Sequence, residues 1–167
     1  MIERFIKSLP DGRLGMSLAE VVIAATVITV FLTALVGLYN LQLKVIFGSA
    51  RQIKAGFLGE EGQEGVKYLR NLSLSANIVP LTTGATYRLV WQEGKWAVTS
   101  SGAYIDGLYD RTIVFDSVER DAQSNIVSSG STVDPNIRKV TVTTSWLERS
   151  ATSTRVLTTY LVNLFDN

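Results

Sequence analysis

The stretch that decides the fold is Gly15-Met16-Ser17-Leu18-Ala19-Glu20, which is followed by an apolar run from Val21 to Leu43. The run contains no charged side chain, and the next charge along the chain is Lys44. A helix that crosses a membrane needs about 20 mostly apolar residues, so the run is long enough to span one. The carboxylate of Glu20 stands directly before it, where a charge is costly, and this marks Glu20 as a candidate functional residue.

The segment before Gly15 has the features of a processed leader. It carries more basic than acidic side chains, which favours a cytoplasmic N-terminus. The sequence Pro10-Asp11-Gly12 is typical of a turn and would leave the Gly15–Met16 peptide bond accessible. The apolar run is also longer than the h-region of a secretory signal, which is about 7–15 residues. The sequence therefore predicts a short cytoplasmic leader and then a membrane helix that begins at Met16 or Ser17.

The combination of Gly15, Leu18, Glu20 and the apolar run resembles the class III leader of type IV prepilins and pseudopilins. The resemblance covers roughly residues 10–43. It implies cleavage by a prepilin peptidase after Gly15, methylation of the new N-terminal residue Met16, and subunit docking through Glu20 and Leu18. Glu20 is then the fifth residue of the mature chain, where the family keeps a glutamate. Two features depart from the family pattern: Met16 stands where Phe is commonest, and Gly37 stands where a proline is frequent.

The resemblance also implies a location and a set of partners. The precursor would be a single-pass protein of the inner membrane with a cytoplasmic N-terminus, and the mature chain would enter an extracytoplasmic pilus or pseudopilus. The implied partners are the prepilin peptidase, other pilin or pseudopilin subunits and the inner-membrane assembly platform, and no cofactor is implied. The glycines of the helix and a tryptophan in the penultimate predicted strand are more typical of minor pilins and minor pseudopilins.

Two simpler interpretations remain open at this point. Ser17-x-x-Glu20 before an apolar run also fits a capping box, in which Glu20 would only satisfy backbone N–H groups at the helix start. The apolar run could equally belong to an unprocessed single-pass membrane protein whose extracytoplasmic β-domain binds a partner. Lipid and the core of a helical filament demand the same composition, so the run itself does not separate these alternatives.

The overall composition restricts the chemistry. The chain contains no cysteine and no histidine, which excludes serine–histidine and cysteine–histidine catalysis, and we expect a protein that is not an enzyme. Once residues 1–15 are removed, basic and acidic side chains are equal in number, so no nucleic-acid binding is expected. Several aspartates and asparagines are scattered through the C-terminal half without the ordered spacing of a calcium loop. We expect them to serve turns and solubility.

The helix is predicted to continue beyond the membrane as an amphipathic segment over residues 44–75. Its apolar residues recur at helical spacing and predict a stripe that faces a core: Ile46, Phe47, Ala50, Ile53, Phe57, Tyr68, Leu69 and Leu72. Glycines recur at every third position, at Gly56, Gly59, Gly62 and Gly65. Each costs about 1 kcal/mol in a helix interior, so we favour fraying or a kink there. Close packing against a neighbouring helix or sheet is the alternative.

The remaining residues, 76–167, have the composition of a β-sheet domain. The predicted strands are Tyr87–Gln92, Lys95–Thr99, Arg111–Ser117, Arg138–Leu147 and Ser153–Phe165. Glu93-Gly94 predicts a hairpin turn, and residues 126–136 a loop. All three tryptophans, Trp91, Trp96 and Trp146, are expected in the core or in cross-strand pairs. The sequence therefore predicts an α+β fold, with a long N-terminal helix packed on an antiparallel sheet of four to five strands.

Overall fold

The computed structural model describes residues 17–127, 132–148 and 150–163. The chain divides into two compact units, Met1–Ile46 and Phe47–Asn167. One long helix, α1 (Leu18–Leu72), contributes to both units and is 55 residues long. A second helix of one turn, α2 (Leu74–Asn77), follows it directly and is capped by the hydroxyl of Ser73, which accepts a hydrogen bond from the N–H of Ala76.

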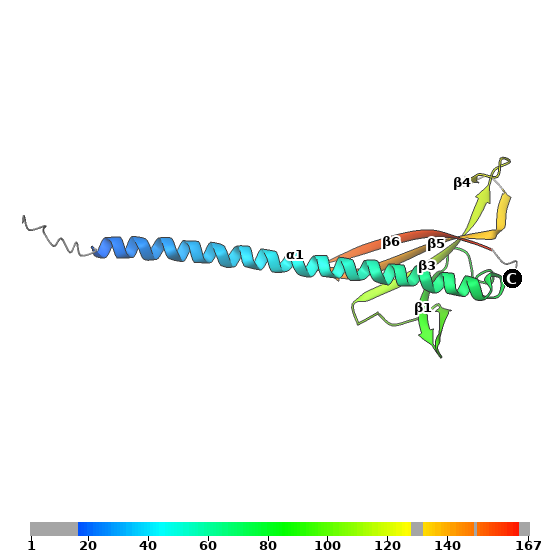
Figure 1. Ribbon diagram of the computed structural model, residues 1–167, viewed down its shortest axis with the longest axis horizontal. Helices are drawn as coiled ribbons and strands as arrows, with labels where there is room; N and C mark the ends of the chain where they lie inside the picture. The colour runs from blue at the N-terminus through cyan, green and yellow to red at the C-terminus, as the bar shows by residue number, and fades with distance from the viewer. Residues whose placement is uncertain (1–16, 128–131, 149, 164–167) are drawn as a thin grey trace, which may run out of the picture. The chain divides into compact units, whose positions relative to one another are not determined.

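The second unit is built on one antiparallel sheet, which lies against the C-terminal part of α1 (Figure 1). Its strands are β1 (Thr86–Gln92), β2 (Lys95–Thr99), β3 (Tyr109–Arg120), β4 (Ile126–Val127), β5 (Thr132–Glu148) and β6 (Ala151–Val162). The strand order is β2-β1-β3-β5-β6, and the short β4 pairs with the far end of β3. The predicted α+β fold is confirmed.

The predicted strands are confirmed in position, with differences in length. The turn at Glu93-Gly94 joins β1 to β2, and both residues have the positive φ that this hairpin turn requires (52° and 76°). The predicted loop over residues 126–136 is wrong at both of its ends, because β4 and the first part of β5 lie there. Ile126 and Val127 of β4 and the mixed polar and apolar residues at the start of β5 take strand conformation by pairing with β3, past a register shift between Ser117 and Val118.

The core lies between α1 and the sheet. Alternate residues of β5 point toward the helix, and Val140, Val142, Thr144 and Trp146 are all buried, as their alternation predicts. The largest fully buried side chain is Phe115 of β3. The side chains of β3 and β5 therefore supply most of the bulk of the core.

The predicted face of α1 is wrong. Of the stripe expected to be buried, only Leu69 is buried; Phe47, Ile53 and Phe57 are each at least 60% exposed. The buried residues of α1 are Ala55, Gly59, Gly62, Gly65, Val66 and Leu69. The helix thus turns its smallest residues to the sheet, because the space there is filled by large side chains of the strands.

The glycines allow this close approach without interrupting α1. A Cβ at Gly59 would lie 2.9 Å from Leu157 Cδ1, and a Cβ at Gly62 would lie 2.9 Å from Val142 Cγ1. At Gly65 an added methyl would overlap Leu89. Gly56 differs, since no atom lies within 4 Å of its Cβ position. Fraying or kinking is therefore wrong for these glycines, and close packing on a sheet explains all of them except Gly56.

Candidate functional site

The N-terminal end of α1 carries the predicted docking residues. Ser17 caps the helix: its Oγ accepts a hydrogen bond from the backbone N–H of Glu20 at 3.3 Å. Leu18 is 85% exposed, and the carboxylate of Glu20 is exposed as well. The predicted cleavage and methylation residues, Gly15 and Met16, lie outside the described residues.

The cap uses only one half of a capping box. Within residues 17–127 and the other described ranges, the Glu20 carboxylate has no hydrogen-bond or ion-pair partner, and it does not accept the N–H of Ser17. Ser17 therefore performs the capping through its own hydroxyl, and the charge of Glu20 is not used for it. Between Glu20 and Glu60 the sequence contains no other acid.

The first unit presents an apolar surface along α1. By length and composition, α1 is the one helix in the described part of the chain that could cross a membrane, and none of its most apolar window is buried. The polar side chains in this segment are satisfied within the helix: Thr26 and Thr29 donate to the carbonyls of Val22 and Ala25, each at 2.8 Å. Thr33 does the same toward Val30. Such hydroxyls can face lipid or another helix without an unpaired donor.

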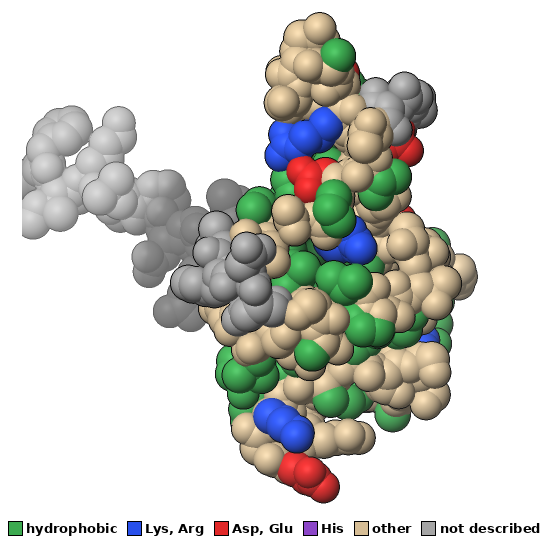
Figure 2. Space-filling view, turned by 90° about the vertical axis from the view of Figure 1, so that its right-hand side faces the viewer, with side chains coloured by type: hydrophobic (Ala, Val, Ile, Leu, Met, Phe, Trp, Pro, Cys, Tyr) green, Lys and Arg blue, Asp and Glu red, His purple; other side chains and the backbone are tan. Residues whose placement is uncertain are grey.

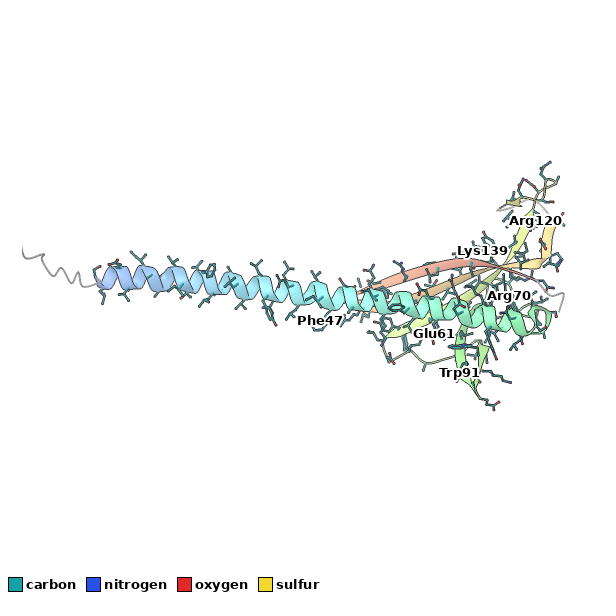
Figure 3. The ribbon with its side chains drawn as sticks, viewed as in Figure 1. Phe47, Glu61, Arg70, Trp91, Arg120 and Lys139 are labelled. Atoms are coloured by element: carbon teal, nitrogen blue, oxygen red, sulfur yellow. The ribbon has the colours of Figure 1, made fainter. Side chains whose placement is uncertain are left out.

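In the second unit, a buried arginine joins the sheet to the helix. Arg111 of β3 is 5% exposed, and its Nη1 donates to the carbonyl of Leu58 at 3.1 Å and to Glu61 Oε2 at 2.8 Å. Its guanidinium also lies 5.6 Å from the ring centroid of Trp96. Glu61 is labelled on α1 in Figure 3. The sequence contained a signal for this position, because Arg111 alternates with the buried Ile113 and Phe115 and so shares their face.

The aspartates of the second unit have separate partners. Asp110 accepts two hydrogen bonds of 2.9 Å from Arg88, Asp106 pairs with Lys54, and Asp134 pairs with Arg120. Asp121 accepts from Asn125 and the following backbone within a turn. In the described ranges no three acidic side chains converge where they could hold a metal ion.

Hydrogen bonds lower the pKa values of two of these carboxylates. A hydrogen bond from the Arg120 side chain is the main cause that lowers the pKa of Asp134 below its ordinary value of 3.8, and the N–H of Asn136 adds to the effect. Hydrogen bonds from Asn125 lower the pKa of Asp121 in the same way. In each case the charged form accepts the bonds. These groups thus stabilise local turns and strand ends.

Trp91 and Trp96 form a cross-strand pair at the β1–β2 hairpin, as predicted, with ring centroids 5.2 Å apart. Trp91, labelled in Figure 3, is 60% exposed, so of the two predicted environments it has the cross-strand pair and not the core. The face turned to the viewer in Figure 2 carries its charged side chains in small separate groups of both signs.

Comparison of the chain with protein-family models, with curated proteins and with solved structures finds no match in any of the three.

Proposed function

We propose that this chain is a structural subunit of a type IV pilin-like filament, a minor pilin or a minor pseudopilin. It is made as a precursor in the inner membrane with its N-terminus in the cytoplasm. A prepilin peptidase hydrolyses the Gly15–Met16 bond, and the new amine of Met16 is methylated. The assembly platform then inserts α1 among the helices of other subunits in an extracytoplasmic pilus or pseudopilus.

The state of Glu20 is the observation that carries this proposal. If Glu20 served only to cap α1, its carboxylate would accept the N–H of Ser17. Instead the hydroxyl of Ser17 makes the cap, and the carboxylate has no partner among the described residues. An ionised carboxylate at the start of a long apolar surface needs a cation when neighbouring helices cover it. Cleavage after Gly15 would create such a cation, the N-terminal amine of a neighbouring subunit.

Replacing Glu20 by glutamine tests the pairing. Glutamine keeps the size of the side chain and one acceptor oxygen, replaces the other oxygen by an amide donor, and removes the charge. Leaving a buried amine without its counter-ion costs about 3–5 kcal/mol, which at 1.4 kcal/mol per tenfold weakens docking by at least about a hundredfold. We therefore expect the Glu20→Gln protein to be cleaved and methylated normally, to stay in the membrane, and to be missing from sheared filaments.

The matched control is Glu93→Gln in the exposed β1–β2 turn, which removes one carboxylate far along the chain from α1. It should enter filaments at the wild-type level. Cell fractionation, recovery of sheared filaments and mass spectrometry of the mature N-terminus give the three readouts. Normal incorporation of the Glu20→Gln protein would refute the charge pair. An intact leader on the wild-type chain, in cells that contain a prepilin peptidase, would instead favour the unprocessed single-pass membrane protein.

A further inference from the structure

Strand β6 forms one end of the sheet and leaves one of its two edges open. It pairs with β5 along its whole length, from Ile137↔Val162 to Glu148↔Ala151, and no described strand pairs with its other side. In an antiparallel ladder, alternate residues direct their N–H and C=O groups away from the partner strand. Strand β6 therefore presents a row of backbone donors and acceptors over 12 residues.

This edge lacks the features that normally protect an exposed strand. Natural edge strands are kept short, or carry charges, prolines or bulges. Strand β6 contains no proline and no glycine, pairs with β5 without a register shift, and has Arg155 as its single charged residue. The opposite edge of the sheet differs: β2 is five residues long and begins with Lys95. One edge is thus protected, and the other remains available for pairing.

A groove lies beside the open edge, between β6 and α1. Its volume is about 330 Å³, and its walls include Ile53, Gly56 and Phe57 from α1 and Arg155 from β6. Ile53 and Phe57 are 60% and 65% exposed, which is unusual for large apolar side chains next to a core. Gly56 keeps the groove open, since nothing lies within 4 Å of its Cβ position.

Two charged side chains of opposite sign line the groove and form no ion pair with each other. Glu60 and Arg155 both line it. Neither forms an ion pair or hydrogen bond with a residue that the structure describes. A ligand that enters the groove from the side of β6 meets the guanidinium of Arg155 together with the apolar side chains of Ile53 and Phe57.

We propose that the open edge of β6 and this groove bind an extended segment of a different polypeptide by strand addition. The backbone of the segment pairs with β6. Its side chains on the helix side enter the groove, where an apolar side chain contacts Ile53 and Phe57 and an acidic one pairs with Arg155. Backbone hydrogen bonds then supply affinity, and the groove supplies specificity. The inference is independent of filament assembly and applies equally to a membrane-anchored monomer.

Charge complementarity assigns the occupant to another protein rather than to a second copy of this chain. Glu60 shares the groove but forms no ion pair with Arg155, so we assign the acid that pairs with Arg155 to the added strand. Strand β6 (ATSTRVLTTYLV) contains no acidic residue, and β2 (KWAVT) contains none either. Pairing of β6 with either sheet end of a second copy would therefore leave Arg155 without a partner.

A tethered strand tests this inference on the full chain in detergent micelles. Residues 164–167 are replaced by an Asn-Gly turn followed by the strand Val-Thr-Val-Thr-Val-Thr-Val-Thr-Glu-Thr, whose glutamate lies opposite Arg155 in the antiparallel register and shares one face with the valines. The tether keeps the probe at an effective concentration of roughly millimolar. Hydrogen exchange is followed by mass spectrometry over β6, with β1 as an internal reference. The matched control carries lysine in place of the glutamate of the added strand.

We expect the glutamate strand to slow exchange of the outward amides of β6 by at least about tenfold and to leave β1 unchanged. The lysine strand should have little effect. In the Arg155→Glu protein the preference should reverse, so that the lysine strand protects β6 and the glutamate strand does not. Unchanged exchange with the glutamate strand overturns strand addition, and equal protection by both strands overturns the acidic partner. Protection of β6 that rises with the concentration of the unmodified chain would overturn the assignment to a different polypeptide.

Discussion

Substituting Gly62 by alanine probes the contact between α1 and the sheet most directly. An added Cβ would lie 2.9 Å from Val142 Cγ1 and 3.0 Å from Arg111 Cδ. Both neighbours are buried in the interface. Val142 is branched at Cβ, so its χ1 is restricted, and its strand is paired on both sides. The methyl group is therefore accommodated only if the Val142 and Arg111 side chains or the helix itself shift.

The expected cost follows from two opposing effects. Overpacking a core by one methyl group costs about 1–3 kcal/mol, whereas replacing glycine by alanine in a helix interior gains about 1 kcal/mol. Gly62→Ala should thus lower the free energy of unfolding by about 0–2 kcal/mol. Gly56→Ala is the matched control in the same helix. Its added Cβ meets no atom within 4 Å, so the higher helix propensity of alanine should raise the free energy of unfolding by about 1 kcal/mol.

The measurement is urea unfolding of a fragment of residues 47–167, followed by tryptophan fluorescence. We expect this fragment to fold, because every buried core residue from Ala55 onward lies within it. The free energies of unfolding of the two alanine variants should differ by about 1–3 kcal/mol. When Val142 is also replaced by alanine, the destabilisation caused by Gly62→Ala should largely disappear. If Gly62→Ala stabilises the fragment as much as Gly56→Ala does, the close approach of α1 to β5 is wrong.

Three further predictions concern packing of the core, stability at low pH and cleavage of the leader. Trp146→Ala should destabilise the same fragment by about 3–5 kcal/mol because its ring is buried, while Trp91→Ala should cost less than about 1 kcal/mol; similar costs would contradict their assigned burial. Because Arg120 lowers the pKa of Asp134 in the folded state, its contribution to stability is present above the ordinary pKa of 3.8 and is lost as the pH falls through the folded value. Asp134→Asn should therefore lower the urea midpoint at neutral pH, and the difference from the wild type should shrink as the pH falls below 3.8 through the folded pKa; a difference that stays constant through this range would argue against the pair. Gly15→Val should block removal of the leader, because a bulky side chain would not fit the peptidase, and a normally processed variant in an N-terminal mass spectrum would contradict the proposed cleavage site.

Local patterns in the sequence determined most of the secondary structure. The uncharged run after Glu20 predicted α1, since only a helix satisfies its own backbone groups in apolar surroundings. Alternation in β5 predicted that Val140, Val142 and Trp146 share one buried face, because side chains in a strand alternate with period two. Glu93-Gly94 predicted the hairpin, because its turn needs two residues with positive φ.

The tertiary structure decided which side of α1 is buried. The apolar stripe through Phe47, Ile53 and Phe57 has the spacing of a core-facing surface, yet the glycine face packs on the sheet. Periodicity reports only the side chains of the helix itself. Here the large side chains in the interface come from the strands, for example Val142 and Leu157, and they pack against glycines of the helix.

Long-range contacts also decided the polar parts of the candidate sites. The cap at Ser17 is a local exception: whether the Glu20 carboxylate accepts the N–H of Ser17 depends on the side-chain conformation of Glu20, and both alternatives fit the same four residues. The partners of Arg111 on α1 lie about fifty residues away in the chain, at Leu58 and Glu61. The open edge of β6 exists only because of the strand order, which places β6 at the end of the sheet. Local propensity specified these elements one by one, and packing between residues far apart in the chain decided which of their surfaces remained free.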